Sequence, residues 1–378
     1  MGKNYKIAFL GWNPFQLAHV KPLLKALPDS VFLLEQRKST QSKSFSESLM
    51  VGVSRQVVHI KPSMLRKLDG EFDILVCQTP FKQLHLFAKT SIAMIQYGYA
   101  KEPHNYGAWR SFADVNLTYG EYARSKISPF SPSVSVGHPR FDQWYDASFH
   151  QDARLKVGRF LDPSKKTILY APTWGDLSSV AQYASAIASL AEHFNVIVKL
   201  HHNSILLERS IPEAFQGQRS LHFFGLETDI FELLSVSDAV ISDYSGAIFD
   251  GVLCEKPVFL LNIQANGLSS DKMDQYSLEF SSREKIGIVI NEPKELKDKV
   301  NDYFLNNHVW AYDWRSTLFL VEHGAVDRAV SALAALGDGL YQPSQAQLYI
   351  RKEMKKLYAY ENKGKFVSVL SRLDSFFR

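Results

Sequence analysis

Residues 239–261 read AVISDYSGAIFDGVLCEKPVFLL, a strand, a helix and a second strand in direct succession. Ala239–Ser242 and Val258–Leu261 are apolar on successive residues, as strands are when helices cover both faces of their sheet. Between them, Ser245–Leu253 has the length and apolar spacing of a short helix. This order predicts two parallel strands joined by a crossover helix.

The same alternation extends in both directions along the chain. In the second half we predict further strands at Thr167–Ala171, Val196–Leu200, Leu221–Phe224 and Ile286–Ile290. In the first half we predict strands at Lys6–Gly11, Val31–Leu34, Val57–Ile60, Ile74–Cys77, Ile92–Ile95 and Val115–Thr118. The main helices are predicted at Phe15–Ala26, Phe81–Lys89, Ser178–His193 and Asp229–Ser235. The pattern indicates an α/β protein with parallel sheets, and it contains neither GxGxxG nor GxxxxGK[ST].

The periodicity is interrupted between Phe130 and Pro163, a stretch rich in proline. We therefore predict two Rossmann-like, doubly wound domains, residues 1–145 and 146–342, facing a central cleft. Such a cleft lies at the carboxyl ends of the strands. Residues 343–378 are predicted to form amphipathic helices that pack back on the N-terminal domain.

The composition is that of a globular protein: of 378 residues, 46% are hydrophobic and 22% are charged. This excludes a disordered, collagenous or coiled-coil chain. Two cysteines, Cys77 and Cys254, cannot form a disulfide framework, and no zinc-ligand spacing is present. No window approaches 18 apolar residues, and the stretch from Met1 to Gly11 is expected to be a first strand rather than a signal peptide.

The net charge of +4 is concentrated at the two ends of the chain. Residues 1–70 hold eleven Lys or Arg against four acids, and residues 350–378 hold eight against three. Two interpretations stay open: solvated surfaces, or contact with an anionic partner such as a membrane surface. No nucleic acid partner is expected.

The strongest local signal for chemistry is the turn from Ser242 to Asp250. Ser242, Asp243, Ser245 and Gly246 follow a strand and precede a helix, where free backbone N–H groups can bind phosphate. An ordinary helix cap made by Asp243 or Ser245 is the alternative.

Two further turns follow strands of the second half. Thr173 and Trp174 could bind a phosphate and cover a ring, although Trp174 could simply pack. Lys199, His201, His202 and Asn203 could bind phosphate or act as acid or base, or they could be surface residues of a loop.

Other candidates lie at the first helix and at the domain boundary. His19, in the first predicted helix, could project into the cleft or be structural. His138 and Arg140 lie in the boundary segment Gly137–Asp142, where Arg140 and Asp142 are expected to form a structural pair.

Four of these segments together resemble the bacterial CDP-glycerol glycerophosphotransferase family of teichoic-acid and capsule synthesis. The family motifs occur in this chain in the same order. G-x-P-R-x-D corresponds to Gly137–Asp142, Y-A-P-T-[WF] to Tyr170–Trp174, and K-x-H-P to Lys199–His202. [ST]-D-Y-S-S corresponds to Ser242–Gly246, and the F-D that follows it corresponds to Phe249–Asp250. The resemblance covers residues 136–261 well and the rest in outline.

The resemblance implies a GT-B architecture and an inverting, metal-independent transfer, with no cofactor and no metal site. It implies that His201 contacts the donor pyrophosphate and is catalytic. It implies donor-binding roles for Thr173, Trp174, Lys199, His202, Asn203, Ser242, Asp243, Ser245, Gly246 and Asp250.

The chain departs from the family pattern in three places. The family has Trp-His-Gly in its first domain, with the histidine proposed as the base, whereas this chain has Gln96-Tyr97-Gly98. Gly175 replaces a frequent basic residue, and Gly246 replaces a serine. We expect Gly98 to line the cleft, and we consider as the base His19, which we favour, His104, His138 and Asp176.

These observations predict a transferase that moves glycerol phosphate or a similar polyol phosphate from a CDP-activated donor to a lipid-linked or polymeric glycan. It would act in the cytoplasm, bound peripherally to the inner face of the membrane. The alternatives are a GT-B enzyme using a nucleotide sugar, such as a glycosyltransferase or a 2-epimerase, and a non-enzymatic scaffold at the membrane.

Overall fold

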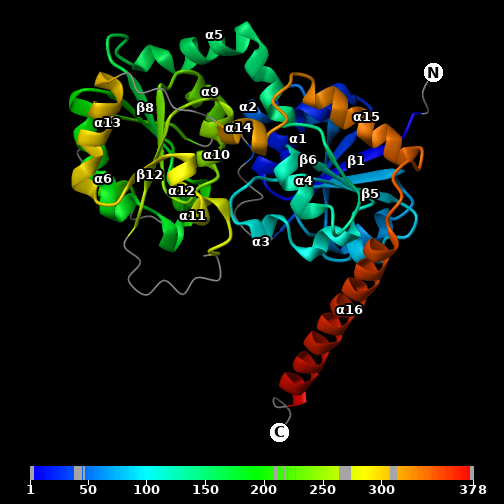
Figure 1. The fold of residues 1–378 in the computed structure, drawn as a ribbon. Helices are drawn as coiled ribbons and strands as arrows, with labels where there is room; N and C mark the ends of the chain where they lie inside the picture. The colour runs from blue at the N-terminus through cyan, green and yellow to red at the C-terminus, as the bar shows by residue number, and fades with distance from the viewer. Residues whose placement is uncertain are drawn as a thin grey trace.

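A computed structural model describes residues 4–37, 45, 47–207, 211–215, 218, 220–225, 227–263, 274–306 and 313–374. Two α/β domains lie side by side, and a long C-terminal helix extends from one of them (Figure 1). In the described part of the chain, no helix combines the length and the apolar character needed to cross a bilayer.

The N-terminal domain contains a seven-stranded sheet in the order β3-β2-β1-β4-β5-β6-β7. All neighbouring strands pair in parallel. The strands are β1 (Ile7–Gly11), β2 (Val31–Glu35), β3 (Val57–Ile60), β4 (Ile74–Cys77), β5 (Ser91–Ile95), β6 (Val115–Thr118) and β7 (Ser133–Ser135). The α-helices within this stretch of chain are α1 (Pro14–Ala26), α2 (Glu47–Met50), α3 (Glu102–Asn105) and α4 (Glu121–Ile127).

The second domain contains a six-stranded parallel sheet in the order β10-β9-β8-β11-β12-β13. Its strands are β8 (Thr167–Tyr170), β9 (Asn195–Val198), β10 (Leu221–Phe223), β11 (Ala239–Ser242), β12 (Val258–Leu261) and β13 (Ile288–Ile290). Its helices are α5 (Ala147–Lys156), α6 (Val180–Ser189), α7 (His202–Leu207), α8 (Ile211–Ala214), α9 (Ile230–Ser235), α10 (Ala247–Leu253), α11 (Leu278–Ser281), α12 (Arg283–Ile286) and α13 (Leu296–Leu305).

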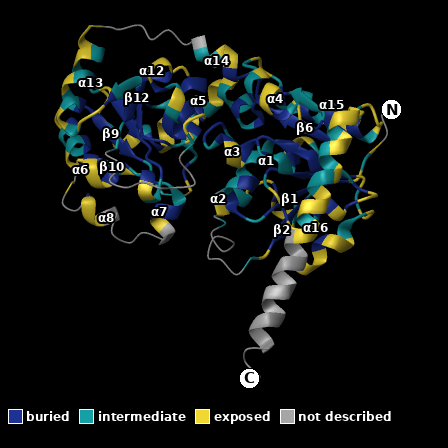
Figure 2. Cartoon of the chain, turned by 60° about the horizontal axis from the view of Figure 1, so that its bottom comes forward, coloured by how far each residue is buried: buried dark blue, intermediate teal, exposed yellow. Residues whose placement is uncertain are grey.

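Most strands away from the sheet edges are buried because helices cover both faces of each sheet (Figure 2). β4, β6, β8, β9, β11 and β12 are buried at every residue, as the continuous apolar runs in the sequence predict. One core cluster of the second domain is built entirely from residues between Ile168 and Val300. The predicted α/β class with two doubly wound parallel sheets is confirmed.

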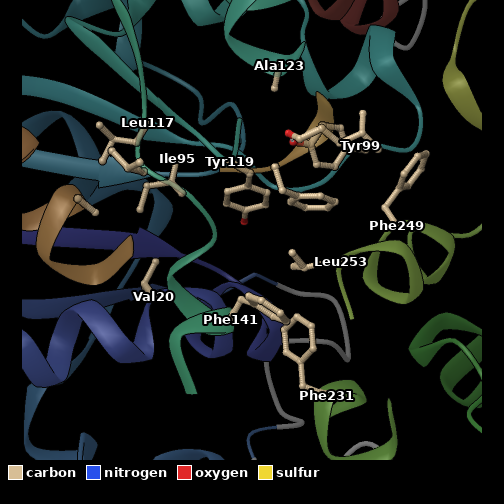
Figure 3. Packing of buried hydrophobic residues seen from close by; sticks show 14 of the residues in the cluster. Val20, Ile95, Tyr99, Leu117, Tyr119, Ala123, Phe141, Phe231, Phe249 and Leu253 are labelled. Carbon is tan, nitrogen blue, oxygen red and sulfur yellow. Dashed lines mark hydrogen bonds between the residues drawn. The ribbon is translucent and has the colours of Figure 1, made fainter. Parts of the chain in front are cut away.

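An apolar cluster joins the two domains (Figure 3). The ring of Tyr99, after β5, lies 5.5 Å from that of Phe249 on α10. At the hinge the ring of Phe141 lies 5.8 Å from that of Phe231 on α9. All four rings are buried, so separating the domains would expose apolar surface.

The chain returns to the N-terminal domain earlier than the predicted boundary at residue 342. After α14 (Asp313–Leu318), the Leu320 N–H donates to the Tyr119 carbonyl oxygen at 2.8 Å. Helix α15 (Ala325–Gly337) then packs on α1 and the N-terminal strands, and its buried residues Ala329 and Leu333 belong to that core. The small and apolar residues of α15 therefore cover the core of the first domain. The sequence had predicted that residues 325–337 belong to the second domain.

Three local predictions differ from the structure. Phe81–Lys89 contains only a short 3-10 turn, Leu84–Leu86, rather than a helix. Strand β7 was not predicted, because a three-residue, partly buried Ser-Val-Ser segment carries little apolar signal. The C-terminal segment forms one helix, α16 (Gln345–Asp374), whose first part lies against the 3-10 segment Ala108–Phe112.

Candidate functional site

A cleft of about 1070 Å³ lies between the two domains. Its N-terminal face is formed by residues that follow β1, β4 and β5, and its C-terminal face by residues that follow β8 and β9 and by the start of α10. These are the carboxyl ends of parallel strands, where ligands bind in open α/β sheets. The predicted site residues that line the cleft are His19, Gly98, His138, Arg140, Thr173, Trp174, Lys199, His201, His202, Asn203, Ser245, Gly246 and Asp250.

His201 stands at the end of the turn that leads from β9 to α7, directly before the first residue of the helix. Its ring stacks between Trp174, at 6.0 Å, and His202, at 4.1 Å between ring centroids. Burial lowers the pKa of His201 to about 2, so the imidazole is neutral. Its Nδ1 accepts the Asn203 N–H at 3.2 Å, which leaves the proton on Nε2. His201 can therefore donate one hydrogen bond to a ligand without carrying charge.

His202 faces the N-terminal domain. Its ring lies 4.1 Å from that of Phe15 on α1, so it forms an aromatic contact between the domains. Burial lowers its pKa to about 4, and the charge of Lys199 adds to that effect. The two adjacent histidines stack on each other and both line the cleft, but their other ring contacts differ: Trp174 for His201 and Phe15 for His202.

Lys199 lines the cleft, but its ammonium group is already engaged. The Nζ atom donates to the Gly225 carbonyl and, at 2.9 Å, to the Thr228 carbonyl. Burial lowers the pKa of Lys199 to about 8. The lysine thus holds the loop after β10 in place, and at most one of its three N–H donors is left for a ligand.

Ser242 and Asp243 do not line the cleft, although both were predicted to bind the donor. The Ser242 hydroxyl donates to the Ala171 carbonyl at 2.6 Å, and both side chains are fully buried. The Asp243 carboxylate accepts the Thr173 and Tyr244 N–H groups at 2.7 Å and the Ser179 N–H and hydroxyl at 2.8 Å. Burial raises the pKa of Asp243, and the hydrogen bonds from Thr173 and Ser179 oppose that effect. Asp243 is therefore the support that positions Thr173.

Gly246 and Ser245 form the beginning of α10. Gly246 is the N-cap residue, and a Cβ atom added there would meet no protein atom within 4 Å. The Ser245 hydroxyl lies 3.3 Å from the Ala247 N–H, a weak local bond. This turn therefore opens onto the cleft, and a side chain at position 246 would extend into space available to a ligand.

A cluster of rings from the N-terminal domain and the hinge faces this turn. The Asn13 side chain caps α1 by accepting the Gln16 N–H at 3.0 Å, which places His19 in the second turn of the helix. The His19 Nδ1 lies 3.1 Å from the Tyr119 hydroxyl. His138 stacks on Tyr119 at 4.1 Å. Burial lowers the pKa of both histidines, that of His138 to about 3, and the nearby Arg140 charge adds to the effect.

Arg140 pairs with Asp229 rather than with Asp142, so the predicted Arg140–Asp142 pair is wrong. One Arg140 nitrogen lies 2.7 and 2.8 Å from the two Asp229 oxygens, which joins the hinge to α9. Asp142 instead accepts the backbone N–H groups of residues 324–326 at 2.7–3.1 Å and so fixes the start of α15.

Asp250 lies one helical turn after Gly246 and lines the cleft. Burial raises its pKa to about 7; the Arg140 charge lowers it and the Asp229 charge raises it. A carboxyl group with this pKa can exchange a proton near neutral pH.

Among the base candidates, His104 also lines the cleft, whereas Asp176 is exposed and does not. Residues that the sequence did not single out are Phe15, Lys101, Tyr119 and Asp229. Tyr119 and Asp229 follow the ends of β6 and β10, and that position is the signal that could have identified them.

Within the described ranges, no group of three or more His, Cys, Asp or Glu side chains gathers closely enough to hold a metal ion. Metal independence and the absence of a cofactor remain predictions.

Comparison with known proteins identifies the family. The family model for CDP-glycerol:poly(glycerophosphate) glycerophosphotransferase matches residues 124–309, which contain all four motifs. The match covers slightly less than half of the chain, so this segment is similar to the family. The resemblance predicted from the motifs is thereby confirmed.

Two curated relatives are teichoic acid poly(glycerol phosphate) polymerases. That of Bacillus spizizenii W23 is 26% identical over 161 residues, which are 40% of this chain and 40% of the relative. That of Bacillus subtilis 168 is 30% identical over 136 residues, which are 33% of this chain and 18% of the relative. The matched part thus spans less than half the length of either polymerase.

Solved structures share the fold. A variant of the wall teichoic acid polymerase TagF soaked with CDPG aligns with a TM-score of 0.60 at 16% identity, over 89% of this chain and 90% of that one. UDP-GlcNAc 2-epimerase of Neisseria meningitidis aligns with a TM-score of 0.61 at 13% identity, over 88% and 99%. The predicted GT-B arrangement is confirmed.

Tyr97 is the main departure from the family pattern that the motifs resemble, because that pattern has a histidine at this position. Tyr97 lines the cleft, and its ring lies 5.3 Å from that of His19. A histidine therefore stands next to the substituted position, contributed by α1 instead of by the loop after β5.

Proposed function

We propose that the chain transfers glycerol phosphate, or a similar polyol phosphate, from a CDP-activated donor to a lipid-linked or polymeric acceptor in cell-surface polymer synthesis. One observation carries the proposal: residues from all four family motifs, which span residues 137–250 of the sequence, line the same cleft. These are Arg140, Thr173, His201 and Ser245 together with their neighbours.

In the proposed reaction an acceptor hydroxyl oxygen attacks the phosphorus that carries the polyol. A new P–O bond forms, the bond to the bridging oxygen of the diphosphate breaks, and CMP leaves with that electron pair. The His201 Nε2–H donates to the diphosphate as negative charge develops on the leaving group. The transfer is direct, with inversion at phosphorus, and uses no metal or cofactor.

We propose His19 as the base that takes the proton of the attacking hydroxyl. If the His19 Nδ1–H donates to the Tyr119 oxygen, at 3.1 Å, the lone pair on Nε2 is left for the hydroxyl proton. His138 is less suited because it is only 5% exposed. Asp250, with a pKa near 7, is the second candidate, and the paired variants in the Discussion separate the two.

A thermal-shift screen against CDP, CMP, UDP and GDP tests the donor class. We expect CDP and CMP to raise the melting temperature most. We also expect Gly246→Val to abolish most of that shift without lowering the melting temperature of the free protein, because the valine would extend into open space in the cleft. A preference for UDP would instead support an enzyme using a nucleotide sugar, and no response to any nucleotide would support a scaffold.

We also propose that the protein is cytoplasmic and binds peripherally to the anionic inner face of the membrane through α16, which projects from the body of the molecule (Figure 1). Arg351 anchors this helix: it donates to the Ser111 carbonyl at 2.6 Å and to Asp114 at 2.8 Å. Met354 and Tyr358 pack on the same side, against the N-terminal core. The outer side carries exposed basic and apolar residues: Leu348, Tyr349, Lys352, Lys355, Lys356, Leu357 and Tyr360.

Charge reversal to glutamate at Lys352, Lys355 and Lys356 should weaken binding to anionic liposomes roughly 100-fold or more, at about 1 kcal/mol per lysine. Cosedimentation at low and high salt measures the effect, and CDP binding should be unchanged. The matched control reverses three exposed basic residues of the other domain: Arg159, Lys285 and Lys294. If the unsubstituted protein stays in the supernatant at low salt, the membrane proposal is wrong.

A further inference from the structure

The loop after β5 crosses the cleft and docks on the second domain. The Lys101 N–H donates to the Glu279 carboxylate at 2.6 Å, and the Glu102 N–H donates to the Ser277 hydroxyl at 3.0 Å. Glu279 and Ser277 are fully buried. Two successive backbone N–H groups of one domain thus depend on acceptors from the other.

The backbone at this contact is unusual. Lys101 has a φ of +60° and a ψ of +59°, the left-handed region that residues with a side chain rarely adopt. Such a conformation persists only where the surroundings hold it, and here the two hydrogen bonds to Glu279 and Ser277 do so. The contact therefore fixes the direction in which the Lys101 side chain leaves the loop.

The Lys101 side chain lines the cleft opposite the donor turns. Its charge is close enough to His201 to lower the pKa of that imidazole, after the larger effects of burial and of His202. Both residues line the same cleft, although they come from different domains.

The charges of the cleft explain why a cation from the N-terminal domain matters. Between Trp12 and Tyr119, the described lining residues include three lysines, Lys21, Lys25 and Lys101, and no Asp or Glu, whereas the hinge contributes Asp142. At the hinge, Arg140 is paired with Asp229, and on the C-terminal face Lys156 is paired with Glu232 and Lys199 holds two carbonyl oxygens. His201 is neutral, so the C-terminal face alone offers little positive charge to a diphosphate.

We propose that Lys101 is a donor-phosphate ligand supplied by the N-terminal domain, and that Glu279 and Ser277 hold it over the donor turn when the domains are together. The proposal rests on the proposed function, because it assumes a nucleoside diphosphate donor. In the transfer, the ammonium group of Lys101 would neutralise charge on the departing CMP beside the Nε2–H of His201. The loop contact would thereby couple domain closure to donor binding.

Calorimetric titration of the full chain with CDP and with cytidine tests this. Lys101→Met, which keeps the length of the side chain, should weaken CDP binding roughly 10- to 100-fold, the usual effect of losing a charge-assisted hydrogen bond. Cytidine affinity should not change, because cytidine has no phosphate. A merely structural role for Lys101 would weaken both ligands equally. Lys61→Met removes an exposed lysine of the same domain that does not line the cleft, and it should change neither affinity by more than about twofold.

Glu279 provides the second arm of the test. Glu279→Leu leaves the lysine but removes the acceptor of its N–H, so CDP affinity should fall. Glu279→Gln retains a carbonyl oxygen and should lower CDP affinity less. Unchanged CDP affinity in Lys101→Met would overturn the phosphate role, and unchanged affinity in Glu279→Leu would overturn the coupling. If the unsubstituted chain fails to bind CDP at all, the proposed function itself is wrong.

Discussion

Replacement of His201 by alanine should lower turnover by roughly 100-fold or more, the usual effect of losing one hydrogen-bond donor that stabilises developing charge. His201 lies in the cleft between Trp174 and His202, and its Nε2–H is the donor available to a ligand. Because its pKa is near 2, His201 stays neutral, so its removal should not shift the pH profile above pH 5. Release of CMP from CDP-glycerol, measured from pH 5 to pH 9, gives both results.

Two paired variants make this test specific. His202→Ala loses a contact with Phe15 rather than a ligand donor, and we expect a much smaller loss of turnover. His19→Gln should lower turnover while leaving CDP affinity intact, because a base acts on the acceptor hydroxyl. If Asp250→Asn has that effect and His19→Gln does not, the base is Asp250. Near-normal turnover in His201→Ala would contradict its assignment.

Asp243→Asn should destabilise the protein by about 3 kcal/mol and weaken CDP binding as well. An asparagine has one acceptor oxygen where the carboxylate has two. If that oxygen keeps the Thr173 and Tyr244 N–H groups, the Ser179 N–H is left buried without an acceptor. The effect on binding would follow because Thr173 and the turn before α10 lose their common support.

Equilibrium urea unfolding and CDP titration measure the two effects of Asp243→Asn. The control is Asp176→Asn, which changes an exposed carboxylate in the same loop region and should leave stability within about 0.5 kcal/mol. If Asp243→Asn matches this control in stability, the buried network contributes less than its four hydrogen bonds indicate.

Much of the fold could be predicted from the sequence because both sheets are parallel and covered on both faces. Continuous apolar runs such as Ile74–Cys77 and Val258–Leu261 predict strands that are buried on both faces. The segment Phe81–Lys89 is apolar too, but it forms turns, because a local pattern does not reveal which residues the rest of the fold covers. The return of α15 depends on contacts between residues far apart in sequence, which no local pattern encodes.

The site could be predicted in part for a related reason. Carboxyl ends of parallel strands meet at one edge, so the positions of Thr173, His201 and Ser245 follow from strand prediction and motif spacing. Strand position does not tell whether a polar residue faces the cleft or supports it from behind, as Asp243 does. The contributions of Tyr119 and Lys101 depend on how the two domains approach each other.

The late return of α15 has a consequence for biosynthesis. One core cluster of the second domain uses only residues between Ile168 and Val300, so this side of its sheet can pack as soon as that stretch has left the ribosome. The first domain needs Leu333 and Leu336 on α15 to cover its core. At translation speeds of about 5–20 residues per second, roughly 10–40 s separate synthesis of the hinge from that of α15. During this interval the nascent N-terminal sheet exposes an apolar face. The N-terminal domain is therefore synthesised first but can finish folding only after α15 has been made.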